Sequence, residues 1–159
     1  MEPLNRAREI FFKYDGSSFH MSRDGADYDE YRRYSVPEQL EKQWLEEVIA
    51  KRLDMLDEPG NWAVVYVLMH HGDTRHLTRL TQAKPRGAFW QRCAYLEDVL
   101  RYVKMCTHAG AIDESQIRDA ADYVLGQAKI IDRDAGQEDS RYRVQRIIEF
   151  AAALRSSTG

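Results

Sequence analysis

Residues 61–71 read NWAVVYVLMHH, and the choice between an all-helical and a mixed fold depends on them. Their β-branched valines suit a buried strand. A strand needs a partner, however, and the sequence contains no second segment with strong strand character. We therefore predict a short, wholly buried helix over residues 62–69, with Asn61 as its N-cap.

The segments on either side of this stretch have helical periodicity, with apolar residues three and four positions apart. Ser35 and Glu38 have capping-box spacing at the start of one such segment. The pattern predicts three long helices, over about 36–56, about 88–109 and 113–131. A loop over residues 132–140 then precedes a last long helix. The fold class that follows is all-α: a multi-helix bundle or short helical array of about six helices.

The first 35 residues are less regular than the rest. The segment LNRAREIFFKY, residues 4–14, could form a short helix that ends at Gly16. The alternation of Phe19 and Met21 with polar residues also permits a minor β-hairpin near residues 10–22. The sequence does not decide between the short helix and the hairpin.

Length and composition place limits on the class of protein. The 159 residues fit one helical domain, 1–159, and the apolar run at 62–69 is far too short to cross a bilayer. The N-terminus lacks the apolar core of a secretory signal. Cys93 and Cys106 would be about 20 Å apart on one helix, too far for a disulfide. We expect a soluble, cytoplasmic protein with no membrane association and two reduced cysteines.

The net charge of −3 conceals an uneven distribution. Residues 61–110 hold 7 basic against 3 acidic side chains, whereas residues 1–60 hold 9 against 14. The basic segment 75–104 also contains Phe89 and Trp90, a combination that can bind single-stranded nucleic acid. The competing expectation is that its arginines pair with acidic residues of neighbouring helices.

The stretch MHHGDTRH, residues 69–76, gathers three histidines and an aspartate. Gly72 suits the left-handed position at the end of a helix, and Asp73 suits the N-cap of the next one. His70 and His71 point in different directions on a helix, so both cannot easily bind one metal ion. We predict a bend between two helices and no metal site, with a metal-dependent hydrolase using His71, Asp73 and His76 as the third-ranked alternative.

The segment DYDEYRRY, residues 27–34, places three tyrosines on one broad helical face among carboxylates. The rings could pack on the core, or they could form a partner surface, because tyrosine is enriched at interfaces. We predict a protein-binding face made of Asp27, Tyr28, Glu30, Tyr31, Tyr34 and Trp44.

The sequence contains none of the motifs that mark nucleophilic or phosphate-binding sites, such as G-x-S-x-G, a glycine-rich phosphate loop or H-E-x-x-H. We therefore assign no catalytic residues and no cofactor. The predicted function is a non-enzymatic protein-interaction module, either an adaptor or an inhibitor of another protein whose identity the sequence does not indicate. The main alternative is a nucleic-acid-binding protein that uses segment 75–104.

Overall fold

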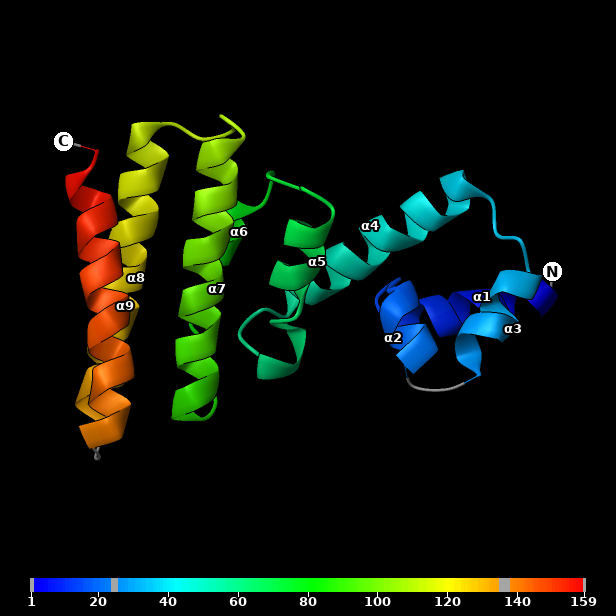
Figure 1. Cartoon of the computed structure of the whole chain (residues 1–159), viewed down its shortest axis with the longest axis horizontal. Helices are drawn as coiled ribbons and strands as arrows, with labels where there is room; N and C mark the ends of the chain where they lie inside the picture. Colours follow the sequence, from blue (N-terminus) through cyan, green and yellow to red (C-terminus); the bar gives the residue numbers. More distant parts are fainter. Residues whose placement is uncertain (1, 24–25, 135–137, 159) are drawn as a thin grey trace. The chain divides into compact units, whose positions relative to one another are not determined.

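The computed structural model describes residues 2–23, 26–134 and 138–158. Within these ranges the chain forms nine α-helices and one 3-10 helix and no β-strand, which confirms the all-α prediction (Figure 1). None of the helices in the described ranges is long and apolar enough to cross a membrane. The contacts divide the chain into two compact units, Met1–Arg52 and Leu53–Gly159.

The first unit contains α1 (Glu2–Lys13), α2 (Ser18–Arg23), α3 (Asp27–Arg33) and most of α4 (Glu38–Asp54). The prediction of a hairpin near residues 10–22 is wrong, because α1, a tight turn and α2 occupy that segment. Gly16 closes the turn with a φ of +73°, and its N–H donates to the Phe11 carbonyl at 2.9 Å. A Cβ at this position would lie 2.6 Å from the Phe11 ring, so glycine is required.

Two apolar clusters form the core of the first unit. One contains Ala7, Phe11, Trp44 and Val48, in which the Phe11 and Trp44 rings meet edge to face at 5.6 Å. The second contains Ile10, Tyr14 and Met21. Of the two apolar side chains that suggested the hairpin, α2 buries Met21 and leaves Phe19 68% exposed. A two-stranded hairpin alone would be marginally stable, which is why packed helices are favoured here.

The second unit is built around α7 (Phe89–His108), α8 (Glu114–Asp134) and α9 (Glu138–Ser156). Figure 1 shows these long helices side by side, with α8 antiparallel to the other two. Cys93, Leu96 and Val103 of α7 are fully buried, as their spacing predicted. Asp113 caps α8 in a reciprocal pair: its Oδ1 accepts from the Gln116 N–H at 2.8 Å, and its own N–H donates to Gln116 Oε1.

Helix α5 (Val64–His70) confirms the helical prediction for the valine-rich stretch. Two details were wrong. Tyr66 is 59% exposed, so the helix is not wholly buried. Asn61 is not its N-cap but lies in the 3-10 helix Pro59–Asn61, where its Nδ2 donates to the Met55 carbonyl at 3.0 Å. The 3-10 turn delays the start of α5 to Val64.

The bend after α5 has the predicted glycine geometry. Gly72 has a φ of +63°, and the Asp73 N–H donates to the Leu68 carbonyl at 2.8 Å, as in a Schellman motif. Asp73 is not the N-cap of the next helix, however, because α6 (Leu77–Leu80) begins only after His76. Its Oδ1 accepts instead from the Arg75 N–H at 3.2 Å, which stabilises the turn between the helices.

The expectation of about six helices was too low, because short helices escape a periodicity argument. Helix α2 (Ser18–Arg23) has only six residues, too few to repeat a pattern. The predicted loop 132–140 is also mostly helical: residues 132–134 end α8, and α9 starts at Glu138. The remaining residues of that prediction, 135–137, lie outside the described ranges.

Candidate functional site

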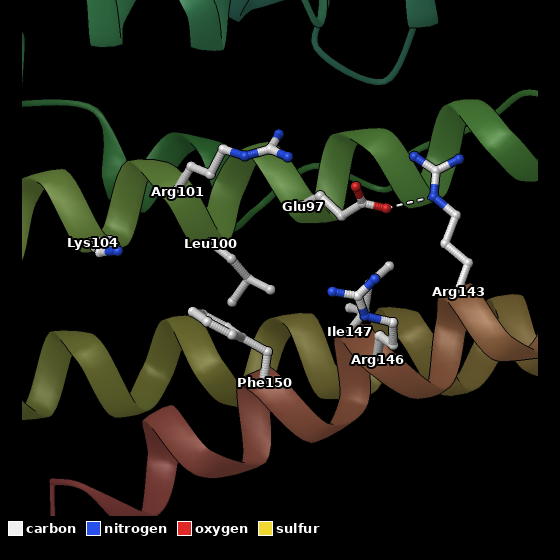
Figure 2. A pocket seen from close by; sticks show the side chains of 8 residues that line it. All are labelled: Glu97, Leu100, Arg101, Lys104, Arg143, Arg146, Ile147 and Phe150. Carbon is white, nitrogen blue, oxygen red and sulfur yellow. Dashed lines mark hydrogen bonds and ion pairs between the residues drawn. The ribbon is translucent and has the colours of Figure 1, made fainter.

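A surface groove of about 580 Å³ lies between α7 and α9 in the second unit (Figure 2). In Figure 2, α8 runs behind α9, and the residues that line the groove all come from α7 and α9. Four basic side chains, one carboxylate and three apolar side chains line the groove: Arg101, Lys104, Arg143, Arg146, Glu97, Leu100, Ile147 and Phe150.

Helical spacing on both walls explains why these side chains meet. On α7, Glu97, Leu100 and Lys104 are three and four residues apart, which places them on one face. Arg143 and Phe150 are seven residues apart on α9, with Arg146 and Ile147 between them. Helix α8 packs more extensively against α7 and against α9 than these two pack against each other, so a seam stays open between them.

The floor of the groove is apolar. Leu100 and Ile147 are almost completely buried, whereas the Phe150 ring is 51% exposed. Figure 2 shows the Leu100 side chain and the Phe150 ring approaching one another from the two walls. The floor therefore consists of a half-exposed aromatic ring beside two buried aliphatic side chains. An apolar side chain of a ligand could cover the exposed part of the ring.

Two of the basic side chains are paired with carboxylates. Arg143 Nε donates to Glu97 Oε1 at 2.5 Å across the groove, and this bond raises the pKa of Arg143. Arg101 donates to Asp98 Oδ1 at 2.6 Å. Asp98 is only 8% exposed, and burial raises its pKa although the Arg101 bond opposes that shift.

The other two basic side chains, Lys104 and Arg146, are exposed and have no hydrogen bond or ion pair with any residue that the structure describes. The only carboxylate in the lining, Glu97, is already engaged by Arg143. The groove therefore presents positive charge beside an apolar floor, a combination suited to an amphipathic ligand of negative charge.

The tyrosines of the predicted partner face lie on α3 and, for Tyr34, at its C-cap in the first unit, and they are half-buried. Tyr28, Tyr31 and Tyr34 pack against the Ile10 cluster. The Tyr31 hydroxyl donates to Glu41 Oε1 at 2.5 Å, and burial, followed by this bond, raises its pKa. The Tyr34 hydroxyl donates to Glu30 at 2.9 Å.

The other members of that face are also engaged within the first unit. Trp44 is only 4% exposed and belongs to the core. Asp27 accepts from the Tyr14 hydroxyl at 2.6 Å and from Lys13 Nζ at 2.9 Å, which together lower its pKa. Glu30 accepts from Arg6 Nε at 2.9 Å. The structure thus brings Tyr31 and Trp44 to the same cluster, and it directs the carboxylates to side chains of their own unit.

Three arginines of the basic segment 75–104 pair with carboxylates. Arg75 pairs with Asp73 at 2.8 Å, and Arg92 with Asp134 at 3.2 Å, in addition to the Arg101–Asp98 pair. The expected pairing with an acidic residue of a neighbouring helix is observed for Arg92, whereas the pairs of Arg75 and Arg101 are local in the chain. Trp90 is 62% exposed at the start of α7 but is not among the residues that line the groove.

The histidines of the bend are not arranged as a ligand set. His76 Nε2 lies 3.3 Å from Asp73 Oδ2, whereas His71 is exposed, and its ring contacts that of His70 with centroids 5.1 Å apart. Burial and the neighbouring His70 lower the pKa of His71. Among the described residues, no three histidine, cysteine or acidic side chains are grouped so that they could hold a metal ion.

Sequence reasoning missed the α9 wall of the groove. Arg143, Arg146 and Phe150 share a face of α9 at helical spacing, a signal that was present in the sequence. The pairing of that face with α7 was not, because Arg143 and Glu97 are 46 residues apart in the chain.

No family model, no curated protein and no solved structure matches this chain. Its function is therefore inferred from its own residues.

Proposed function

We propose that this protein is a non-enzymatic protein-interaction module, an adaptor or an inhibitor, that docks a partner protein in the α7–α9 groove. The observation that carries the proposal is the groove itself. It combines an apolar floor with two basic side chains, Lys104 and Arg146, that have no partner among the described residues. Apolar centres with a polar rim are the usual anatomy of protein interfaces.

The groove is favoured over the tyrosine face of α3 because the polar groups of that face are already hydrogen-bonded within the first unit. The Tyr31 and Tyr34 hydroxyls and the Asp27 and Glu30 carboxylates already bond within the first unit. A partner at that face would have to compete for them. At the groove, binding would instead cover the exposed half of Phe150.

An interaction role is favoured over catalysis by the chemistry of the lining. The eight side chains that line the groove include no histidine, cysteine, serine or threonine. The carboxylate of Glu97 is held by Arg143, so it is poorly placed to act as a general base.

The main alternative, nucleic-acid binding through segment 75–104, draws weaker support. Most of the arginines described above are paired with carboxylates, which reduces the number of phosphates the segment could neutralise. We also propose that the protein acts in the cytoplasm. Cys93 and Cys106 are buried free thiols that form no disulfide, which suits a reducing compartment.

Site-specific photocrosslinking in the native host tests the proposed function. A benzophenone amino acid at position 146 should form a discrete protein adduct that is lost when Phe150→Glu is introduced into the same chain. The matched control carries the probe at Lys129, an exposed position on α8 outside the groove. Mass spectrometry should place the crosslinked peptide in the partner. Equal adducts from both positions, or adducts to nucleic acid alone, would contradict the proposal.

A further inference from the structure

The shape of the groove suits a helix as its occupant. Both of its walls are helices, whose backbone groups are already hydrogen-bonded, so no edge is available for an added strand. On each wall the first and last lining residues are seven positions apart, Glu97 and Lys104 on α7 and Arg143 and Phe150 on α9, which is about 10 Å at ~1.5 Å per residue. That length corresponds to about two helical turns, the distance covered by apolar anchors at i, i+3 or i+4, and i+7.

The arrangement of α7, α8 and α9 supports the same conclusion. Helix α8 packs against both α7 and α9 on one side of the seam between them (Figure 2). A helix in the groove would pack against the same two helices from the opposite side. The result is a four-helix arrangement, in which each helix buries one apolar stripe.

The floor defines what the apolar face of such a helix must provide. Leu100 and Ile147 form a base that is already desolvated, and the Phe150 ring stands half-exposed beside it. A leucine, methionine or phenylalanine placed there would cover the ring and add contacts with both aliphatic side chains. This buried centre is where a large share of the affinity would arise.

The rim defines the charge of the flanks. Arg101 is 58% exposed on its side chain, and Lys104 and Arg146 are exposed without an ion pair among the described residues. Glu97 does not oppose them, because it bonds Arg143. Arg101 is already paired with Asp98, so carboxylates on the two sides of the apolar stripe would meet Lys104 on the α7 wall and Arg146 on the α9 wall.

A polynucleotide fits the same surface less well. Single strands are bound by basic grooves in which several aromatic rings stack on successive bases. The lining here contains one aromatic ring, Phe150, on an aliphatic floor.

We propose that the α7–α9 groove binds an acidic amphipathic helix of the partner protein, with apolar side chains on Leu100, Ile147 and Phe150 and carboxylates at Lys104 and Arg146. This inference rests on the proposed function and specifies the partner chemistry.

Fluorescence anisotropy with the full chain and defined peptides tests it. The probe is a labelled, end-capped peptide of about 15 residues, long enough to sample a helix, with leucines at i, i+3 and i+7 flanked by glutamates. Three controls share its length: one with glutamines for the glutamates, one with lysines, and one with the leucines shuffled off a single face. A single-stranded oligothymidine of the same length tests the nucleic-acid alternative.

The acidic peptide should bind about tenfold or more tightly than the glutamine and shuffled peptides, because each provides only one of the two complementary features. Arg146→Glu should weaken it by about tenfold, whereas the charge-matched Lys129→Glu on α8 should not. The Lys104→Glu, Arg146→Glu double variant should bind the lysine peptide more tightly than the unmodified chain does. Circular dichroism should show that these surface variants remain folded.

Other outcomes would overturn the inference. Equal binding of the acidic and glutamine peptides would remove the charge requirement, and equal binding of the shuffled peptide would remove the helical face. Tighter binding of the oligothymidine would favour nucleic acid. If photocrosslinking identifies a groove-bound protein whose crosslinked segment is neither acidic nor helical, this inference fails while the proposed function stands. If no groove-specific protein adduct forms, the proposed function fails as well.

Discussion

Replacing Tyr102 with phenylalanine should lower the free energy of unfolding by about 2 kcal/mol, because its hydroxyl makes two hydrogen bonds worth about 1 kcal/mol each. Tyr102 is fully buried on α7. Its hydroxyl donates to the Asp73 carbonyl at 2.7 Å and accepts from the His76 N–H at 3.1 Å. These bonds tie the bend between α5 and α6 to α7.

The magnitude follows from what the substitution retains. Phenylalanine keeps the buried ring, so no cavity forms and the apolar contribution is almost unchanged. The loss is confined to two backbone groups of the bend, which would become unpaired in a partly buried position. Burial is the main reason that the pKa of Tyr102 is raised, so the hydroxyl stays protonated and able to donate at neutral pH.

Urea denaturation followed by circular dichroism measures the effect, with an unchanged m-value as the condition for comparing the midpoints. The matched control is Tyr142→Phe on α9, where the side chain is 69% exposed and its hydroxyl bonds no described residue. Amide exchange at His76 should accelerate in Tyr102→Phe and not in the control. A change below about 0.5 kcal/mol, the usual range for surface substitutions, would refute the reasoning.

Three further predictions concern single residues. Tyr31→Ala should destabilise the protein by about 2 kcal/mol or more in a thermal melt, because its half-buried ring packs on the core, whereas Tyr142→Ala should have almost no effect; equal melts would mean that the Tyr31 ring contributes no packing. Gly72→Ala should cost about 1 kcal/mol in urea denaturation, although a Cβ there meets nothing within 4 Å, because the φ of +63° is strained for alanine; an unchanged midpoint would contradict this. The Arg75 hydrogen bond lowers the pKa of Asp73 to about 2, below its ordinary value of 3.8, so its stabilising contribution should be complete above about pH 4 and lost as the pH falls through 2. An acid titration of Asp73→Asn should have a correspondingly shallower loss of stability, and an unchanged pH profile would show that the carboxylate does not contribute.

Much of the helical architecture follows from local sequence. The long helix over Phe89–His108 was predicted to within a residue at each end, because its apolar residues repeat over many turns. The Asp113 cap and the Gly72 bend were also predictable, since each depends on the chemistry of a few adjacent residues. Helix α2 was missed because its six residues cannot establish a period.

The tyrosine segment shows the same limit in the candidate site. The three-residue spacing correctly indicated that Tyr28, Tyr31 and Tyr34 lie close together along one helical segment. It could not indicate whether their rings face the core or the solvent. The direction depends on α1 and α4, which supply the apolar surface and the polar partners of the rings.

The groove depends most strongly on tertiary structure. Each wall is a regular helical face that can be recognised in the sequence, and the basic character of 75–104 was visible from composition alone. Which cations remain unpaired is decided by neighbours distant in the chain: Asp134 engages Arg92 and Glu97 engages Arg143, whereas Lys104 and Arg146 have no such neighbour among the described residues. Local periodicity reports which side of a helix is apolar, but ion pairing and the open seam between α7 and α9 arise only when helices far apart in sequence pack together.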